Sequence, residues 1–374
     1  MITTSIVITL MYLLLIGSFA FGFEKVKTFK LEKTPSKTRF SVIVPFRNEA
    51  GNLPALLTSI HALNYPKDLF EIIFVDDDSD DDSVELIEKS TTESHVYFKV
   101  VLNERKTNSP KKDAITTAIK HATNDWIITT DADCVLPNHW LEGFDEFIQK
   151  NNTHCIVAPV TYIESNRFLN RFQLLDLLSL QGATMGGFGI KKPFLCNGAN
   201  FGYKKSLFIE VNGFDGNAQT ASGDDVFLLE KAVKKHPKHV HYLKCEHSIV
   251  LTKAQPTWAQ LINQRKRWAA KTSAYDNWFG KCAGLMVLLE NALVLALVLL
   301  LVLGVLNLRT LVFSLFIKCS IDFLLIYKSA VFFNQKSVLR HYLLGFMVYP
   351  VFSVYVACWS LFSSYQWKGR RFKK

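Results

Sequence analysis

Four long apolar runs constrain the fold of this chain more than any other feature of its sequence. Residues 1–23 carry no charged side chain, and further apolar runs fill residues 283–308, 311–333 and 342–365. A helix crosses the hydrocarbon core of a bilayer with about 20 consecutive apolar residues. The sequence therefore predicts one N-terminal and about three C-terminal helices that span a membrane or associate with it.

The flanks of the first run predict its orientation. Residues 1–23 lack the basic start and the small-residue cleavage site of a removable signal peptide, so we expect a retained transmembrane anchor. Six lysines and arginines but only two glutamates follow within residues 24–39. Because basic residues beside a span favour the cytosolic side, we expect a multi-pass protein of the cell (inner) membrane with residues 24–281 in the cytosol.

The sequence leaves the topology of the C-terminal region, residues 282–367, open. Its middle apolar run contains Lys318 and Asp322, which are spaced as a pair on one face of a helix. If this run crosses the membrane, the basic tail at residues 368–374 faces outward, against the positive-inside rule. If it does not cross, the basic residues that follow it face outward instead. A re-entrant middle segment is therefore an alternative.

The middle of the chain alternates strand-like and helix-like segments. Apolar runs of strand length begin at Phe40, Phe70, Tyr97 and Trp126, and amphipathic helical patterns follow the first three. We expect Asn48 to cap the first of these helices. Strands that alternate with helices predict an α/β domain with a Rossmann-like, mostly parallel sheet, in which ligands bind at the carboxyl ends of the strands.

Polar side chains cluster where three of these strands end. The clusters are residues 47–49, 76–78 and 131–133. Because the carboxyl ends of parallel strands lie along one edge of a sheet, we expect a shared ligand site there. Each cluster taken alone is also compatible with a solvated loop, and we assign residues 80–82 to such a loop.

The segment WIITTDADC at residues 126–134 carries a candidate metal site. Alternation along an extended chain places Asp131 and Asp133 on one face. Two carboxylates this close repel each other unless a cation lies between or beside them. Oxygen ligands favour Mg²⁺ or Mn²⁺, and Mg²⁺ commonly combines one or two carboxylates with substrate phosphates. A surface turn with two aspartates is the alternative for this motif by itself.

Charge and cysteine content restrict the partners of the protein. The formal net charge is +10, but the basic residues gather at the membrane flanks and in the tail KGRRFKK rather than in one patch. We therefore expect contact with anionic membrane lipids and not with nucleic acid. The seven cysteines form no C-x-x-C pair, so we expect free thiols and no zinc site.

Seven motifs within residues 40–271 resemble, in their order, those of one enzyme family. They are SVIVPFRNE, FVDDDSDD, KKDA, TTDADCVLP, NGANFGYKKSLFIEVNGFD, SGDD and QRKRW. The series resembles the family 2 inverting glycosyltransferases of GT-A fold. In particular it resembles the membrane-embedded branch with cellulose, chitin, hyaluronan and poly-N-acetylglucosamine synthases and ceramide glucosyltransferase. Two positions depart from the family pattern, since Arg47 stands where an aromatic residue is common and Asp78 where glycine is usual.

The resemblance implies a role for each motif. The nucleotide-sugar donor is expected at Pro45, Arg47, Glu49, Asp76, Asp77, Lys111 and Asp131. A Mg²⁺ or Mn²⁺ cofactor is expected at Asp131 and Asp133, and the catalytic general base is expected to be Asp225. The acceptor and the diphosphate are expected at Asp224, Gln264, Arg267 and Trp268.

The local sequence around Asp225 fits the role of a base. It begins the helical pattern DDVFLLEKAVKK after Ser222 and Gly223, which places it at a helix start that can face a cleft. A structural alternative exists, because acidic side chains at a helix start are stabilised by the helix dipole. Asp224 fits that structural role as well.

These patterns divide the chain into four expected parts. They are a transmembrane anchor at residues 1–23, a GT-A domain at 24–281, a C-terminal transmembrane region at 282–367 and the basic tail at 368–374. Within the GT-A domain we expect interfacial helices near residues 166–185 and 256–271.

The resemblance implies a membrane-bound, metal-dependent, inverting hexosyltransferase. It would move a sugar from a nucleotide-sugar, with a UDP-sugar favoured, to a lipid or glycan acceptor at the cytosolic membrane face. A processive polysaccharide synthase subunit that works with partner proteins is the alternative. Two other classes fit less well. An inactive scaffold would have lost the metal pair or the base, and a nucleotidyltransferase would need a glycine-rich phosphate loop that PFRNEAG does not provide.

Overall fold

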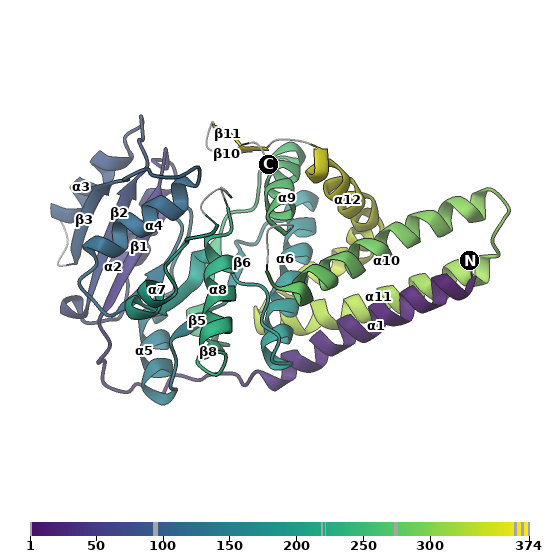
Figure 1. Ribbon diagram of the computed structural model, residues 1–374, viewed down its shortest axis with the longest axis horizontal. Helices are drawn as coiled ribbons and strands as arrows, with labels where there is room; N and C mark the ends of the chain where they lie inside the picture. The colour runs from purple at the N-terminus through teal and green to yellow at the C-terminus, as the bar shows by residue number, and fades with distance from the viewer. Residues whose placement is uncertain are drawn as a thin grey trace.

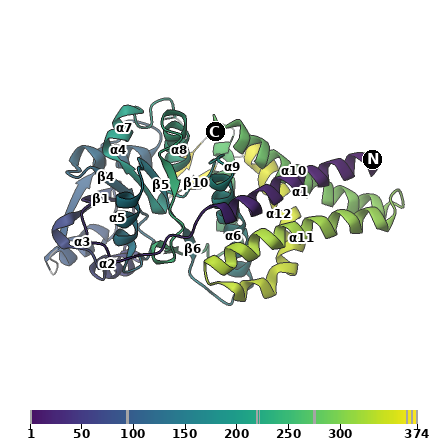
Figure 2. The same ribbon diagram turned by 90° about the horizontal axis from the view of Figure 1, so that it is seen from below.

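A computed structural model describes residues 2–92, 96–217, 220, 222–272, 276–362, 365–367 and 370–372. The molecule consists of an α/β domain and an elongated group of helices, and the N-terminal helix points away from the α/β domain (Figure 1). A view turned by 90° shows the same two parts (Figure 2). Within the predicted basic tail, residues 368, 369, 373 and 374 lie outside the described residues.

The α/β domain is built on a seven-stranded sheet with the strand order β3-β2-β1-β4-β7-β5-β8. The neighbours β3, β2, β1 and β4 run parallel, whereas β7 runs antiparallel to both β4 and β5. The strands are β1 (Phe40–Phe46), β2 (Phe70–Asp76), β3 (Tyr97–Leu102), β4 (Trp126–Thr129), β5 (Cys155–Val157), β7 (Phe201–Lys204) and β8 (Val240–Tyr242). Two short strands, β6 (Val160–Tyr162) and β9 (Val250–Thr252), form a separate parallel pair. The predicted mostly parallel sheet is confirmed.

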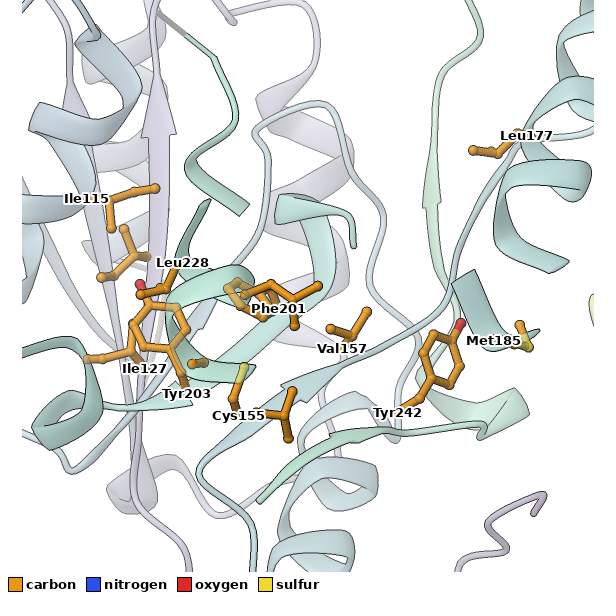
Figure 3. Close-up of a cluster of buried hydrophobic side chains, with 14 of the residues drawn as sticks. Ile115, Ile127, Cys155, Val157, Leu177, Met185, Phe201, Tyr203, Leu228 and Tyr242 are labelled. Carbon is orange, nitrogen blue, oxygen red and sulfur yellow. The ribbon is translucent and has the colours of Figure 1, made fainter. Parts of the chain in front are cut away.

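Helices cover both faces of this sheet. They are α2 (Leu53–His61), α3 (Ser83–Thr92), α4 (Pro110–His121), α5 (Trp140–Lys150), α7 (Lys205–Glu210) and α8 (Asp224–Lys235). Strand side chains alternate between the faces, so Ile43 packs in a cluster with α4 and α8, and Val44 in a cluster with α2, α3 and α5. Ile127 of β4 and Leu228 of α8 lie together in the first cluster (Figure 3).

The predicted cap of the first helix in the domain is wrong. α2 begins at Leu53, and the residue before it is Asn52. Asn48 has a φ of 51°, and its side-chain oxygen accepts a hydrogen bond from the backbone N–H of Asp80 at 3.0 Å. Asparagine tolerates this left-handed conformation better than most residues. Asn48 therefore shapes the turn after β1.

Four helices of the described chain are long and apolar enough to cross a membrane. They are α1 (Ile2–Lys25), α10 (Trp278–Val302), α11 (Leu308–Phe332) and α12 (Tyr342–Phe362). α1 packs along α10 and α11. The predicted number of apolar helices is confirmed. α11 is one continuous helix of 25 residues, so its run does not break as a re-entrant segment would.

Two further helices, α6 (Phe168–Gly189) and α9 (Trp258–Thr272), connect the α/β domain to the apolar helices. Where α6 crosses α1 the two backbones nearly touch. A Cβ on Gly22 would lie 2.2 Å from the Gly186 carbonyl oxygen, and one on Gly189 would lie 1.8 Å from the Gly22 carbonyl oxygen. The glycines of α6 therefore allow close helix packing.

Candidate active site

A cavity of about 1400 Å³ begins at the carboxyl ends of β1, β2 and β4 and continues into the helical part. The residues that follow these strands, the start of α8 and side chains of α6 and α9 form one part of its wall. Helices α1, α10, α11 and α12 form the other part. Small-molecule pockets commonly measure about 300–1,000 Å³, so this cavity has room for more than one ligand of that size.

Four aspartates and one lysine meet in the part of the cavity at the strand ends. Asp131 and Asp133 follow β4, Asp224 and Asp225 begin α8, and Lys111 lies in the first turn of α4. The Lys111 Nζ lies 2.6 Å from Asp131 Oδ1 and 3.5 Å from Asp224 Oδ2. The structure thus brings together side chains that the sequence places in three separate motifs.

Lys111 is a fixed positive charge in this cluster. Burial works to lower the pKa of its ammonium group, but the carboxylates of Asp131, Asp224 and Asp225 outweigh burial and raise the pKa.

The thiol of Cys134, which follows Asp133, is buried near the same carboxylates. Burial, together with the negative charge of nearby Asp133, raises the pKa of its thiol, so the thiol stays neutral and is not a nucleophile.

The donor set at Asp131 and Asp133 fits a hard divalent cation. Both carboxylates reach the cavity, and oxygen ligands of this kind are those that Mg²⁺ and Mn²⁺ prefer. Within the described residues no group of three His, Cys, Asp or Glu side chains is arranged to hold a metal. A bound cation would therefore take its remaining ligands from phosphates or water. The contact with Lys111 shows that Asp131 already attracts a cation in the protein alone.

The backbone of Gly198 positions Asp225. The Gly198 N–H donates to Asp225 Oδ2 at 3.1 Å, and the Gly198 carbonyl accepts from the Thr129 hydroxyl at 2.7 Å. A Cβ at this position would lie 3.0 Å from Asp224 Oδ2 and 3.4 Å from Lys111 Nζ. A larger residue at this position would press on Asp224 and Lys111, so glycine suits the close approach of the start of α8 to this segment.

The residues after β1 and β2 form the outer wall of the same cavity. The predicted donor residues that line it are Pro45, Arg47, Glu49 and Asp77. Asp76 is buried behind this wall, where its Oδ1 accepts a hydrogen bond from the Ser79 N–H at 3.0 Å. Of the two aspartates considered for the nucleotide, the structure therefore turns Asp77 toward the cavity.

Asp77 has partners that the sequence analysis missed. Its carboxylate accepts hydrogen bonds from Arg105 at 2.6 and 2.7 Å, from Asn103 at 2.7 Å and from Arg370 at 2.6 Å. Burial would raise the pKa of Asp77, but the hydrogen bonds from Arg105, Asn103 and Arg370 outweigh burial and lower it. The side chain is therefore an ionised, acceptor-only group. No motif pointed to Arg105 or Arg370, because both lie outside the strand-end clusters.

Helix α9 supplies the next part of the wall. Gln264, Arg267 and Trp268, which were predicted for the acceptor or the diphosphate, all line the cavity. Their neighbour Arg265 is buried, with its Nε 2.7 Å from Asp176 Oδ2 on α6 and its guanidinium carbon 4.1 Å from the centre of the Trp268 ring. This missed ion pair fastens α9 to α6 and holds Trp268 in place.

The far part of the cavity lies among the apolar helices. Lys318 and Asp322 of α11 and Tyr12 of α1 line it. The Lys318 Nζ lies 2.5 Å from Asp322 Oδ2, and the Tyr12 hydroxyl donates to Asp322 Oδ1 at 2.6 Å. The predicted helical pair is thus formed, and its two charges neutralise each other inside the bundle.

Comparison with known proteins places this site in a family. Residues 41–211 match the family model described as Glycosyl transferase family 2. Residues 41–211 therefore form a family 2 glycosyltransferase domain. The matched residues include all three strand-end clusters and Lys111, whereas Asp225 and α9 lie beyond them.

Curated relatives match parts of the chain. The poly(ribitol-phosphate) beta-N-acetylglucosaminyltransferase TarS of Staphylococcus aureus (strain Mu50 / ATCC 700699) is 29% identical over 122 residues, which are 33% of this chain and 21% of TarS. The probable glycosyltransferase YdaM of Bacillus subtilis (strain 168) is 24% identical over 259 residues, 66% of this chain and 60% of YdaM. The undecaprenyl-phosphate 4-deoxy-4-formamido-L-arabinose transferase of Enterobacter sp. (strain 638) is 33% identical over 171 residues, 42% of this chain and 49% of that protein. The chain therefore spans less than two thirds of the length of each of these relatives.

A solved structure resembles nearly the whole chain. The mannosyltransferase PcManGT from Pyrobaculum calidifontis, solved in complex with GDP-Man and Mn²⁺, superposes with a TM-score of 0.58 at 16% identity and covers 96% of this chain and 99% of its own. At this identity the likeness concerns the fold. The fold is the predicted GT-A fold, accompanied by one N-terminal and three C-terminal apolar helices.

Proposed function

We propose that this protein is a membrane-bound, metal-dependent, inverting glycosyltransferase that moves a sugar from a UDP-sugar to a lipid acceptor at the cytosolic membrane face. One observation carries the proposal. The cavity that holds Asp131, Asp133 and Asp225 at the strand ends continues without interruption between apolar helices. A donor with a charged diphosphate fits the first part, and the hydrocarbon of a lipid fits the second.

The donor would bind with its diphosphate beside Lys111, Asp131 and Asp133. A divalent cation bound to Asp131 and Asp133 would neutralise the charge that develops on the departing diphosphate. Lys111 adds a positive charge that is already in place before the donor arrives, and preorganised charge of this kind lowers the barrier to leaving-group departure. The Mn²⁺ complex of PcManGT supports a divalent cation in this fold.

Asp225 would act as the general base. In an inverting reaction the acceptor oxygen attacks the anomeric carbon from the side opposite the leaving diphosphate, and the new C–O bond forms as the bond to the diphosphate breaks. The acceptor hydroxyl loses its proton to Asp225. The side chain is oriented for this by the N–H groups of Gly198 and Val226, at 3.1 and 2.8 Å from its two oxygens. Proton removal by a positioned base contributes about 10²- to 10⁴-fold to rate.

The acceptor would enter from the membrane. Phe19, Leu325 and Phe346 are among the apolar side chains that line the far part of the cavity, and they offer contacts to a hydrocarbon chain. The Enterobacter relative carries the lipid carrier undecaprenyl-phosphate in its name, which supports a lipid acceptor. Trp268 also lines the cavity, and its ring would offer an apolar face to the acceptor.

A second candidate function is processive synthesis of a polysaccharide together with partner proteins. The Lys318–Asp322 pair and the hydroxyl of Tyr12 favour it, because they give the far part of the cavity polar groups that a sugar chain can contact. In either case we propose that residues 24–281 form the cytosolic domain and residues 282–367 the C-terminal membrane region of an inner-membrane protein.

The test is a transfer assay on membranes that contain the full-length protein. The membranes are incubated with a panel of radiolabelled nucleotide sugars plus Mn²⁺ or Mg²⁺ and then extracted with organic solvent. Label from a UDP-sugar in the organic phase supports lipid glycosylation, whereas label in large aqueous material supports the polymerase. Asp133→Ala and Asp225→Asn should both be inactive. Asp80→Asn, which changes an exposed aspartate outside the cavity wall, should keep activity.

A further inference from the structure

A buried lysine of α4 holds the segment that leads into α8. Lys112 is only 1% exposed, and its Nζ donates to the backbone carbonyls of Asn217 at 2.7 Å and of Thr220 at 2.8 Å. The Nζ also lies 4.5 Å from the centre of the Phe227 ring, in the first turn of α8. At this distance a cation is attracted to the face of an aromatic ring. Lys112 thus contacts both the loop before α8 and the first turn of that helix.

These contacts lie on both sides of Asp225 in the sequence. Thr220 precedes Asp225, and Phe227 follows it. Between Thr220 and Asp225 the chain passes through Gly223, whose φ of 90° is a conformation that residues other than glycine rarely adopt. Because the chain is held before and after this turn, Lys112 limits the positions that the Asp225 carboxylate can take.

Lys112 acts on a different part of the site from its neighbour Lys111. Lys111 lines the cavity and lies 2.6 Å from Asp131. Lys112 is not part of the cavity wall, and its ammonium group is directed to the loop instead. Any influence of Lys112 on sugar transfer therefore passes through the segment that it holds.

We infer that Lys112 is a positioning residue for Asp225; the inference rests on the proposed role of Asp225 as the general base. An ammonium group offers three N–H donors, and Lys112 directs two of its hydrogen bonds to the loop. Without these bonds the loop can shift, and the start of α8 shifts with it. A displacement of about 1 Å at a reacting group can lower the rate about 10²-fold. Lys112 therefore supports proton removal without touching a substrate.

The test compares two lysines that hold the same loop. The control is Lys231 of α8, whose Nζ donates to the carbonyls of Val211, Gly213 and Asp215, at the end of the loop farther from the base. We expect Lys112→Met to lower kcat about ten- to a hundredfold. Its dissociation constant for UDP, measured on the full-length protein in detergent with Mg²⁺, should change little. Lys231→Met should keep most of kcat, whereas a purely structural role would make the two variants alike.

A second comparison separates positioning of the base from any other effect of Lys112. In the Asp225→Asn background there is no base to position, so adding Lys112→Met should lower kcat no further. The measurement is transfer of label from a UDP-sugar, corrected for the amount of protein that binds UDP. A full additional loss in that background overturns the inference, as does an unchanged kcat in Lys112→Met alone. If Asp225→Asn itself keeps full kcat, the proposed general base falls as well. If Asp225→Asn is impaired and Lys112→Met is not, only the role of Lys112 is lost.

A milder variant keeps the inference testable if Lys112→Met does not fold. The side chain in Lys112→Gln is shorter, but its amide can still donate to a carbonyl of the loop. We expect a smaller loss of kcat than in Lys112→Met, with UDP binding retained and with no further loss in the Asp225→Asn background. An unchanged kcat in a folded Lys112→Gln protein would then overturn the inference.

Discussion

The two ends of the cavity carry charge in different ways. At the strand ends, the Lys111 ammonium group lies 2.6 Å from Asp131 and 3.5 Å from Asp224, and the carboxylates of Asp133 and Asp225 line the same part of the cavity. Among the apolar helices, Lys318 and Asp322 neutralise each other at 2.5 Å. The first end therefore attracts a cation and, through it, a diphosphate. The second end is suited to an uncharged part of a ligand.

Removal of divalent cations should have the largest effect on transfer activity. It should affect the strand-end part of the cavity and leave the part among the apolar helices unchanged. With excess chelator we expect transfer activity to fall to background, because the diphosphate then departs without its counter-charge. Added Mn²⁺ or Mg²⁺ should restore it. The measurement is transfer of label from a UDP-sugar in membranes, with the thermal unfolding temperature followed in parallel. Full transfer activity in the presence of chelator would show that the strand-end part of the cavity does not need a divalent cation.

Substitution of the general base should have the next largest effect. Asp225→Asn keeps the shape of the side chain but cannot accept the proton, so we expect kcat to fall about 10²- to 10⁴-fold. The dissociation constant for UDP should change little, because Asp225 would contact the acceptor and not the nucleotide. Titration of UDP into the purified variant checks this separation. A variant that lost UDP binding as well would show that Asp225 belongs to the donor site.

Removal of one partner of the buried Lys318–Asp322 ion pair tests the part of the cavity among the apolar helices. Lys318→Ala leaves Asp322 without its counter-charge, and we expect a loss of about 3–5 kcal/mol in stability, as for other buried pairs with one partner removed. The double variant Lys318→Met with Asp322→Leu should recover most of this loss, because neither charge remains. Thermal unfolding in detergent measures both. If the double variant is as unstable as Lys318→Ala, the two side chains contribute to stability by contacts other than the neutralisation of each other's charge.

The smallest expected effect is that of Asp77→Asn on the pH dependence of stability at acid pH. The pKa of Asp77 lies below its ordinary value of 3.8 in the folded protein. Its contribution to stability is therefore fully present above that ordinary value and is lost as the pH falls through the lower, folded-state pKa. We expect Asp77→Asn to be less stable at neutral pH and to show a shallower loss of stability between about pH 4 and 2. Unfolding midpoints measured across this range, with Asp80→Asn as the control, test the sign.

Much of the strand-end site could be predicted because it depends on local rules. Each strand is a short apolar run, and the carboxyl ends of parallel strands lie along one edge of a sheet, so Asp77 and Asp131 were expected at the same edge, where both line one cavity. The prediction that Asn48 caps the first helix of the domain was wrong for a reason that is also local. The turn after β1 runs through Asn52 before the helix begins, and a polar residue at a strand end does not show by itself where that helix starts.

The partners of these groups could not be predicted in the same way. Arg265 finds Asp176, and Arg370 finds Asp77, across large distances in the sequence, and no spacing rule connects them. The same holds for Gly198, whose missing Cβ makes room for Lys111 and Asp224.

The sequence by itself determined the α/β sheet, the four apolar helices and the acidic strand ends, because periodicity and run length act within short segments. Only the tertiary structure decided that the acidic strand ends and the long apolar helices share one cavity, and that the last described strand, β11 (Arg370–Phe372), reaches back to Asp77. The physical reason is that a contact between distant segments depends on how whole helices and sheets pack. Packing is a property of surfaces that are complete only when the chain has folded.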